Sequence, residues 1–112
     1  MNDAPTTTAL RRRRATLLRQ IPSLGAILKG SLIERYKRCG KPGCKCAQGA
    51  GHGPKYYLSI SRTGERPLME YVPNDYHDDV VAFLENHKKL RQIIDEICEI
   101  NLEILRRRER LD

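Results

Sequence analysis

Three cysteines and one histidine lie close together, in a segment that is rich in glycine, proline and lysine and has little apolar surface to pack. They are Cys39, Cys44, Cys46 and His52. Thiolate and imidazole are preferred zinc ligands, and three cysteines with one histidine form a usual tetrahedral set. The spacing Cys-x4-Cys-x-Cys-x5-His therefore predicts a Cys3His site for structural zinc.

Two alternatives remain open for the same segment. The spacing is not the Cys-x2-Cys knuckle, and a Cys-x-Cys pair can strain a tetrahedral site, so the thiols could be reduced and metal-free. They could also serve redox or nucleophilic chemistry, although no acid–base partners accompany a candidate nucleophile. A nuclease would need clustered carboxylates, but Asp75, Asp78 and Asp79 lie together at the start of an expected helix, where they favour its dipole. We therefore expect no catalytic activity and no small-molecule substrate.

The elements expected to position this segment form an α+β fold with a small three-stranded antiparallel sheet. Residues 31–38 and 56–61 are the predicted strands on either side of the Cys-rich loop. In the second strand, period-two alternation places Tyr56, Leu58 and Ile60 on one face and Tyr57, Ser59 and Ser61 on the other. A turn around Gly64 then leads into a third strand, 67–72.

The sequence predicts one helix before the strands and one helix after them. Residues 1–8 are predicted to be a disordered tail, and 9–21 a short amphipathic helix that Thr8 could cap and Pro22 ends. With the sheet, this helix makes a predicted domain, 9–73. Residues 74–112 predict a long coiled-coil-like helix of about 55 Å.

The long helix carries more apolar surface than a lone helix can leave in water. We expect the N-terminal helix to pack on part of it and two chains to pair along the rest, giving a homodimer. The residues expected at this dimer seam are Leu90, Ile94, Ile97, Asn101 and Ile104.

Composition favours a polyanionic partner. The chain has 21 Lys and Arg against 14 Asp and Glu, a formal net charge of +7. Excess positive charge is typical of nucleic-acid-binding proteins. No secretory signal and no long apolar run is evident, so we expect reduced thiols, a cytoplasmic location and no membrane partner.

Basic residues gather in three clusters, at 11–14, 35–45 and 106–110, and tyrosines accompany the expected sheet. Lysine and arginine neutralise phosphates, and exposed rings can stack on bases. The plainer interpretation is that the arginine runs are solvated helix surface and the tyrosines cover a thin core. The candidate nucleic-acid-binding residues are Arg35, Lys37, Arg38, Lys41, Lys45, Lys55, Tyr57 and Arg62.

Residues 30–46 and 51–58 also carry a resemblance to a prokaryotic family of unknown function. The family shares a Cys-Gly-Lys-Pro-x-Cys-x-Cys loop, a His-Gly-Pro-Tyr element, a hairpin ending in Tyr-Val-Pro and a charged C-terminal helix. Lys55 stands where the family more commonly has an aromatic or other residue, which is a minor departure. Similar elements occur near or within transposase-like proteins, which implies DNA as a partner.

These observations predict a small DNA-binding protein, an accessory or regulator of a mobile element, whose Cys3His loop holds structural zinc. The alternative is a protein-interaction or assembly module that acts through the long C-terminal helix.

Overall fold

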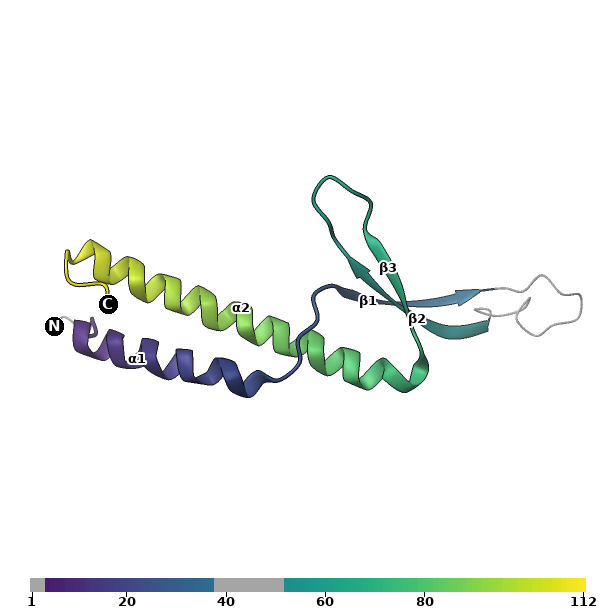
Figure 1. The fold of residues 1–112 in the computed structure, drawn as a ribbon, viewed down its shortest axis with the longest axis horizontal. Coiled ribbons are helices and arrows are strands. Elements are labelled where there is room, and N and C mark those ends of the chain that lie inside the picture. The colour runs from purple at the N-terminus through teal and green to yellow at the C-terminus, as the bar shows by residue number, and fades with distance from the viewer. Residues whose placement is uncertain (1–3, 38–51) are drawn as a thin grey trace, which may run out of the picture. The chain divides into compact units, whose positions relative to one another are not determined.

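The protein is an α+β fold in the computed structural model, which describes residues 4–37 and 52–112 (Figure 1). Its order is α1 (Thr7–Gln20), a 3₁₀ turn (Ile21–Leu24), β1 (Ser31–Lys37), β2 (His52–Ile60), β3 (Leu68–Val72), a 3₁₀ turn (Asn74–Tyr76) and α2 (His77–Arg106). The predicted fold class is confirmed. A short N-terminal helix, a three-stranded antiparallel sheet and a long C-terminal helix are all present.

The chain divides into two compact units. The helix unit comprises Met1–Ile27 and Asn86–Asp112, and the sheet unit comprises Leu28–Glu85. This division differs from the expected domains 9–73 and 74–112, because α1 belongs with the second part of α2 and not with the sheet. All five tyrosines of the chain fall in the sheet unit.

Helix α1 begins two residues earlier than the sequence predicted. The side chain of Thr6 caps it by accepting a hydrogen bond from the backbone N–H of Ala9 at 3.1 Å. Thr6, and not Thr8, is therefore the N-cap, and two residues of the expected tail belong to the helix. At the other end, Pro22 lies in the 3₁₀ turn, as its fixed φ and missing N–H favour.

The core of the helix unit lies between α1 and the second part of α2, which run side by side in opposite directions (Figure 1). Leu17 of α1 is 2% exposed and Ile104 of α2 is 0% exposed. The other members of this core are Ile93 and Ile100, with Leu10, Ile21, Leu24 and Ile97 packed against them. The expectation that the N-terminal helix packs on the long helix is confirmed.

Helix α2 begins with Asp78 and Asp79 in its first turn, where carboxylates interact favourably with the helix dipole. It ends at Arg106, before the end of the predicted helical segment. Arg108 has a φ of 56°, and the N–H of Glu109 donates to the carbonyl of Ile104 at 3.3 Å. The N–H of Arg108 donates to Leu105 at 2.9 Å, so the helix ends in a Schellman motif with arginine where glycine is usual.

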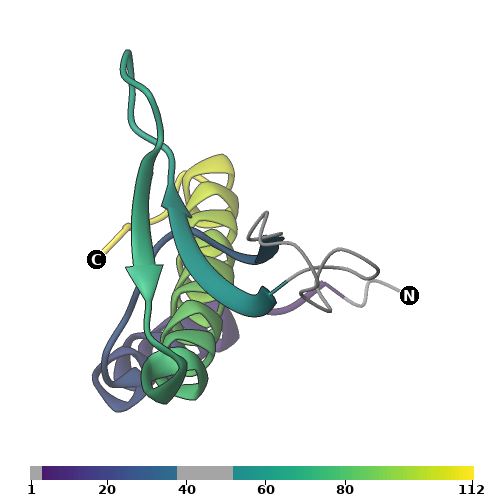
Figure 2. The ribbon, with the colours of Figure 1, turned by 90° about the vertical axis from the view of Figure 1, so that its right-hand side faces the viewer.

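The sheet has the order β1-β2-β3, and both pairs are antiparallel (Figure 2). Gly64, with a φ of 72°, lies in the turn between β2 and β3, as predicted. Gly30 precedes β1 at a φ of 134°, and a Cβ there would lie 2.7 Å from the carbonyl oxygen of Ser59. The start of the β1–β2 pairing therefore requires glycine.

One face of the sheet packs against the first turns of α2. Leu58, Val72 and Val80 are the buried centre of this second core. The residues packed around them are Leu28, Leu32, Tyr56, Ile60 and Leu84. The ring of His77 lies 4.3 Å from that of Tyr56, centroid to centroid, at the start of α2. The predicted alternation of β2 is confirmed, with Tyr56, Leu58 and Ile60 on the covered face.

No helix in the described ranges combines the length and the apolar character that crossing a bilayer requires.

Candidate nucleic-acid interface

The second face of the sheet is not covered by any described element of the sheet unit. Strand alternation and the pairing register assign eight described residues to it. We call this surface the open face; its residues are Ser31, Ile33, Arg35, Lys55, Tyr57, Ser59, Met69 and Tyr71. Three of the predicted nucleic-acid-binding residues, Arg35, Lys55 and Tyr57, are thus brought together.

Two tyrosines form the centre of the open face. Tyr57 and Tyr71 are direct partners across β2 and β3, with ring centroids 5.6 Å apart and planes at 62°. Aromatic rings prefer such an edge-to-face arrangement over face-to-face contact. Tyr71 is 49% exposed, so much of its ring surface is in contact with solvent.

Two cations lie beside the tyrosines. Arg35 and Lys55 are partners across β1 and β2, and the guanidinium carbon of Arg35 lies 5.6 Å from the ring centroid of Tyr57. That distance is within the range of a cation–π interaction. With Tyr36, these three residues line a hollow of about 420 Å³.

The open face has positive charge without a compensating carboxylate. Neither Arg35 nor Lys55 takes part in an ion pair within ranges 4–37 and 52–112. The two acids of the strands lie on the covered face. Glu34 is the cross-strand neighbour of Tyr56, and Glu70 is that of Leu58. Glu34 accepts a hydrogen bond from the Tyr36 hydroxyl at 2.7 Å, which raises the pKa of that phenol.

The other predicted nucleic-acid contacts are not part of this surface. Arg62 lies between β2 and β3, 3.3 Å from the Glu65 carboxylate. Lys37 ends β1, where its backbone pairs with His52, and its side chain is not described. Arg38, Lys41 and Lys45 lie outside the described residues.

The predicted zinc ligands also fall almost wholly outside the described residues. Cys39, Cys44 and Cys46 lie in the segment 38–51 that connects β1 and β2, and His52 is described only through its backbone in β2. Among the described residues, no group of three or more potential ligands comes together elsewhere.

The arginines of α1 are used within the helix unit. The Arg13 guanidinium donates to both carboxylate oxygens of Glu96, at 2.6 and 3.1 Å. This contact raises the pKa of Arg13 and lowers that of Glu96. Arg14 donates to Oδ1 of Asn101 and to the carbonyl of Leu111, both at 2.6 Å.

Two further arginines link the ends of the helix unit. Arg11 donates to the carbonyl of Arg110, and Arg107 donates to the hydroxyl of Thr7 at 3.2 Å. Arg107 also pairs with Glu103 at 3.2 Å. The first and third basic clusters of the sequence therefore supply contacts that hold α1 against α2.

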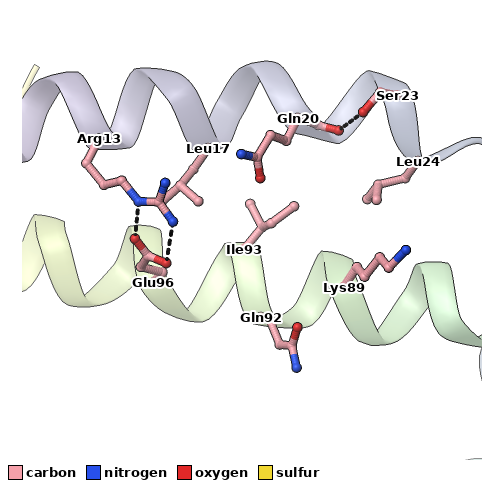
Figure 3. A pocket seen from close by; sticks show the side chains of 9 residues that line it. All are labelled: Arg13, Leu17, Gln20, Ser23, Leu24, Lys89, Gln92, Ile93 and Glu96. Atoms are coloured by element: carbon pink, nitrogen blue, oxygen red, sulfur yellow. Dashed lines mark hydrogen bonds and ion pairs between the residues drawn. The ribbon is translucent and has the colours of Figure 1, made fainter.

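A groove of about 380 Å³ runs between α1 and α2 in the helix unit (Figure 3). Leu17, Leu24 and Ile93 give it apolar walls, and the Arg13–Glu96 ion pair lies at one end. Lys89 also lines the groove, so its lining holds two cations and one carboxylate.

The residues expected at a dimer seam are divided between two environments. Three of the five contact α1 of the same chain: Ile97 packs on the core, Ile104 is fully buried and Asn101 accepts from Arg14. Leu90 and Ile94 instead line a shallow hollow on α2, and Ile94 is 45% exposed. α1 thus covers part of the side of α2 that the heptad pattern assigned to a second chain, and Leu90 and Ile94 lie outside the core that it forms.

Tyr71 is a central residue of the open face that the list of predicted contacts omitted. Its position follows from the register of the hairpin. Because Ile60 pairs with Leu68 at the turn, Tyr57 pairs with Tyr71. The alternation of β3 could have identified it, because Tyr71 shares a face with Met69 and not with Val72.

In comparisons with known proteins, residues 7–82 match the family described as Domain of unknown function (DUF6788). No curated protein and no solved structure matched the chain.

Proposed function

The chain belongs to this DUF6788 family, and we propose that it binds nucleic acid, with DNA as the expected partner, through the open face of its sheet. One observation carries the proposal. Arg35 and Lys55 lie beside the Tyr57–Tyr71 pair on a surface without a carboxylate among its described residues.

The physical argument rests on charge and ring chemistry together. Cations without ion-pair partners attract phosphates and release counterions when they bind them. Tyrosine rings give bases or sugars an apolar surface to contact. The net charge of +7 favours encounter with a polyanion at low ionic strength.

Binding is tested with purified protein and a fluorescent DNA fragment, by anisotropy at several salt concentrations. We expect affinity that falls steeply with salt, since phosphate contacts dominate it. Arg35→Glu and Lys55→Glu should each weaken binding strongly at low salt.

Lys29 provides the matched control. It is exposed in the same unit, outside the open face, so Lys29→Glu changes the net charge by the same amount. If all three substitutions weakened binding equally, general charge and not the open face would be responsible. Absence of binding at low salt would contradict the proposal itself.

Structural zinc held by Cys39, Cys44, Cys46 and His52 is a separate proposal. The pairing of β1 with β2 supports it only by bringing the two ends of the segment 38–51 to neighbouring strands. Metal analysis of protein purified without chelator should give about one zinc per chain, lost in Cys44→Ser. Folded, zinc-free protein would favour reduced, metal-free cysteines.

The role of an accessory or regulator of a mobile element is the finer form of the proposal, and it rests on the family resemblance. It predicts preferential binding to the end sequences of such an element over unrelated DNA of the same length. Equal affinity for both would leave general nucleic-acid binding as the function.

A second candidate function is assembly through α2, and an exposed apolar stripe favours it. Ile94, Leu102 and Leu105 are 45%, 40% and 44% exposed, and the exposed Cys98 lies between them at helical spacing. Such a stripe can be covered by a second copy of the chain. Sedimentation should then show a dimer that Ile94→Asp dissociates, while a monomeric wild-type protein would exclude this candidate.

A further inference from the structure

The centre of the open face is a row of three side chains across the whole sheet. Ile33, Tyr57 and Tyr71 are direct partners on β1, β2 and β3. The next row on one side holds only Arg35 and Lys55, because β3 has ended there. Neighbouring rows on one face are two residues apart, about 6.7 Å, and the cations occupy the row next to the rings.

Part of the ring surface stays available, since Tyr71 is 49% exposed and the Arg35 guanidinium lies over the ring of Tyr57 only. The planes of Tyr57 and Tyr71 are inclined by 62°, so the rings are not stacked on one another. The Tyr57 ring also borders the hollow of about 420 Å³ with Arg35 and Lys55. That volume is within the range of small-molecule sites, about 300–1,000 Å³, and can accept a planar base.

Double-stranded DNA fits the row of Ile33, Tyr57 and Tyr71 poorly. Three strands already span about 10 Å between the outer strand axes, and backbone and side chains add to that width. The major groove is only about 12 Å wide, which suits one helix or a two-stranded ribbon. Bases in a duplex are also stacked on each other, so their faces are closed to tyrosine.

We infer that the open face binds single-stranded nucleic acid, with unpaired bases stacked on Tyr57 and Tyr71 and the neighbouring phosphates on Arg35 and Lys55. This inference rests on the proposed function and names its substrate class. Stacking on a ring tolerates any base, so the two tyrosines by themselves give little sequence preference.

The test compares three labelled probes of the same sequence by fluorescence anisotropy: single-stranded DNA, single-stranded RNA and the fully paired DNA duplex. We expect both single strands to bind more tightly than the duplex at every salt concentration. Tyr71→Ala should weaken single-strand binding about 5- to 150-fold and leave duplex binding nearly unchanged.

Two further variants separate stacking from folding. Tyr71→Phe keeps the ring and should retain single-strand affinity, whereas loss of affinity in this variant would contradict stacking. Tyr76→Ala is the matched control, because Tyr76 is 60% exposed but lies in the 3₁₀ turn before α2, outside the open face. Its affinity for all three probes should stay at the wild-type value.

The outcomes distinguish this inference from the proposed function. Duplex binding as tight as single-strand binding, weakened by Arg35→Ala but not by Tyr71→Ala, would overturn the inference and leave nucleic-acid binding standing. Failure to bind any of the three probes at low salt would remove both.

Discussion

The helix unit and the sheet unit use positive charge in opposite ways. In the helix unit, Arg13 pairs with Glu96, and Arg14 donates to Asn101 and Leu111. In the sheet unit, Arg35 and Lys55 have no ion-pair partner among the described residues and lie beside tyrosine rings. The longest run of arginines in the sequence thus supports the fold, while two cations separated in sequence form the candidate interface.

The largest expected effect concerns what holds the helix unit together. Ile104→Ala should lower the free energy of unfolding by about 2–5 kcal/mol, since the side chain is fully buried between α1 and α2. Leu105→Ala, at a neighbouring position that is 44% exposed, should change it by less than about 0.5 kcal/mol. Urea unfolding measures both.

The same experiment tests which side of α2 is covered. If Leu105→Ala cost as much as Ile104→Ala, and stability rose with protein concentration, a second chain would contribute to the core.

The next prediction separates the stability of the helix unit from DNA binding by the sheet unit. Arg14→Ala removes two hydrogen bonds from a charged donor and should lower the free energy of unfolding by about 1–3 kcal/mol, without changing DNA affinity. Lys55→Ala should reduce DNA affinity and lower the salt slope by about 0.7–0.9, without changing stability beyond about 0.5 kcal/mol.

Arg12→Ala serves as the control for both measurements, because Arg12 is exposed and its side chain has no hydrogen bond or ion pair within the described part of the chain. A loss of DNA affinity in Arg14→Ala comparable with that in Lys55→Ala would erase the distinction between the units.

A smaller effect is expected at Arg108, where the backbone and not the charge matters. Arg108→Gly should raise the free energy of unfolding by about 0.5–1 kcal/mol, because glycine adopts a φ of 56° without steric cost. Arg106→Gly, in the last turn of α2, should lower it by about 1 kcal/mol. Destabilisation by Arg108→Gly would mean that this side chain stabilises the helix end.

The smallest effect is the pH dependence of the Arg13–Glu96 pair. The pKa of Glu96 is lower in the folded protein, so the pair stabilises the fold above the ordinary glutamate pKa. This contribution is lost as the pH falls through the lowered value. Both side chains are about half exposed, at 51% and 43%, so solvent screens the interaction.

Thermal unfolding from neutral to acidic pH measures this contribution. Glu96→Gln should be slightly less stable than the wild type at neutral pH and equally stable in acid. A difference that persisted in acid would have a cause other than the charge of Glu96.

Local periodicity was sufficient to predict much of the sheet. The alternation of Tyr56 to Ser61 assigned both faces of β2 correctly, and Gly64 identified the turn. Arg35, Lys55 and Tyr57 could be named as candidates because residue type and position on a strand carried the information.

Contacts between distant segments could not be predicted in the same way. The arginines of α1 meet partners such as Glu96 and Asn101, and no local pattern indicates which acid or amide an arginine will reach. Apolar residues cover several sides of α2, so the heptad pattern alone did not show that α1 would bury Ile93 and Ile100. Three successive threonines, at 6–8, likewise offered equivalent caps.

The position of the tyrosines has an optical consequence. The chain has no tryptophan, and its five tyrosines all belong to Leu28–Glu85, so ultraviolet emission arises from the sheet unit alone. Far-ultraviolet circular dichroism, in contrast, is dominated by the helices. Because α1 and most of α2 belong to the helix unit, the two signals recorded together during denaturation report mainly on different units, without any added dye.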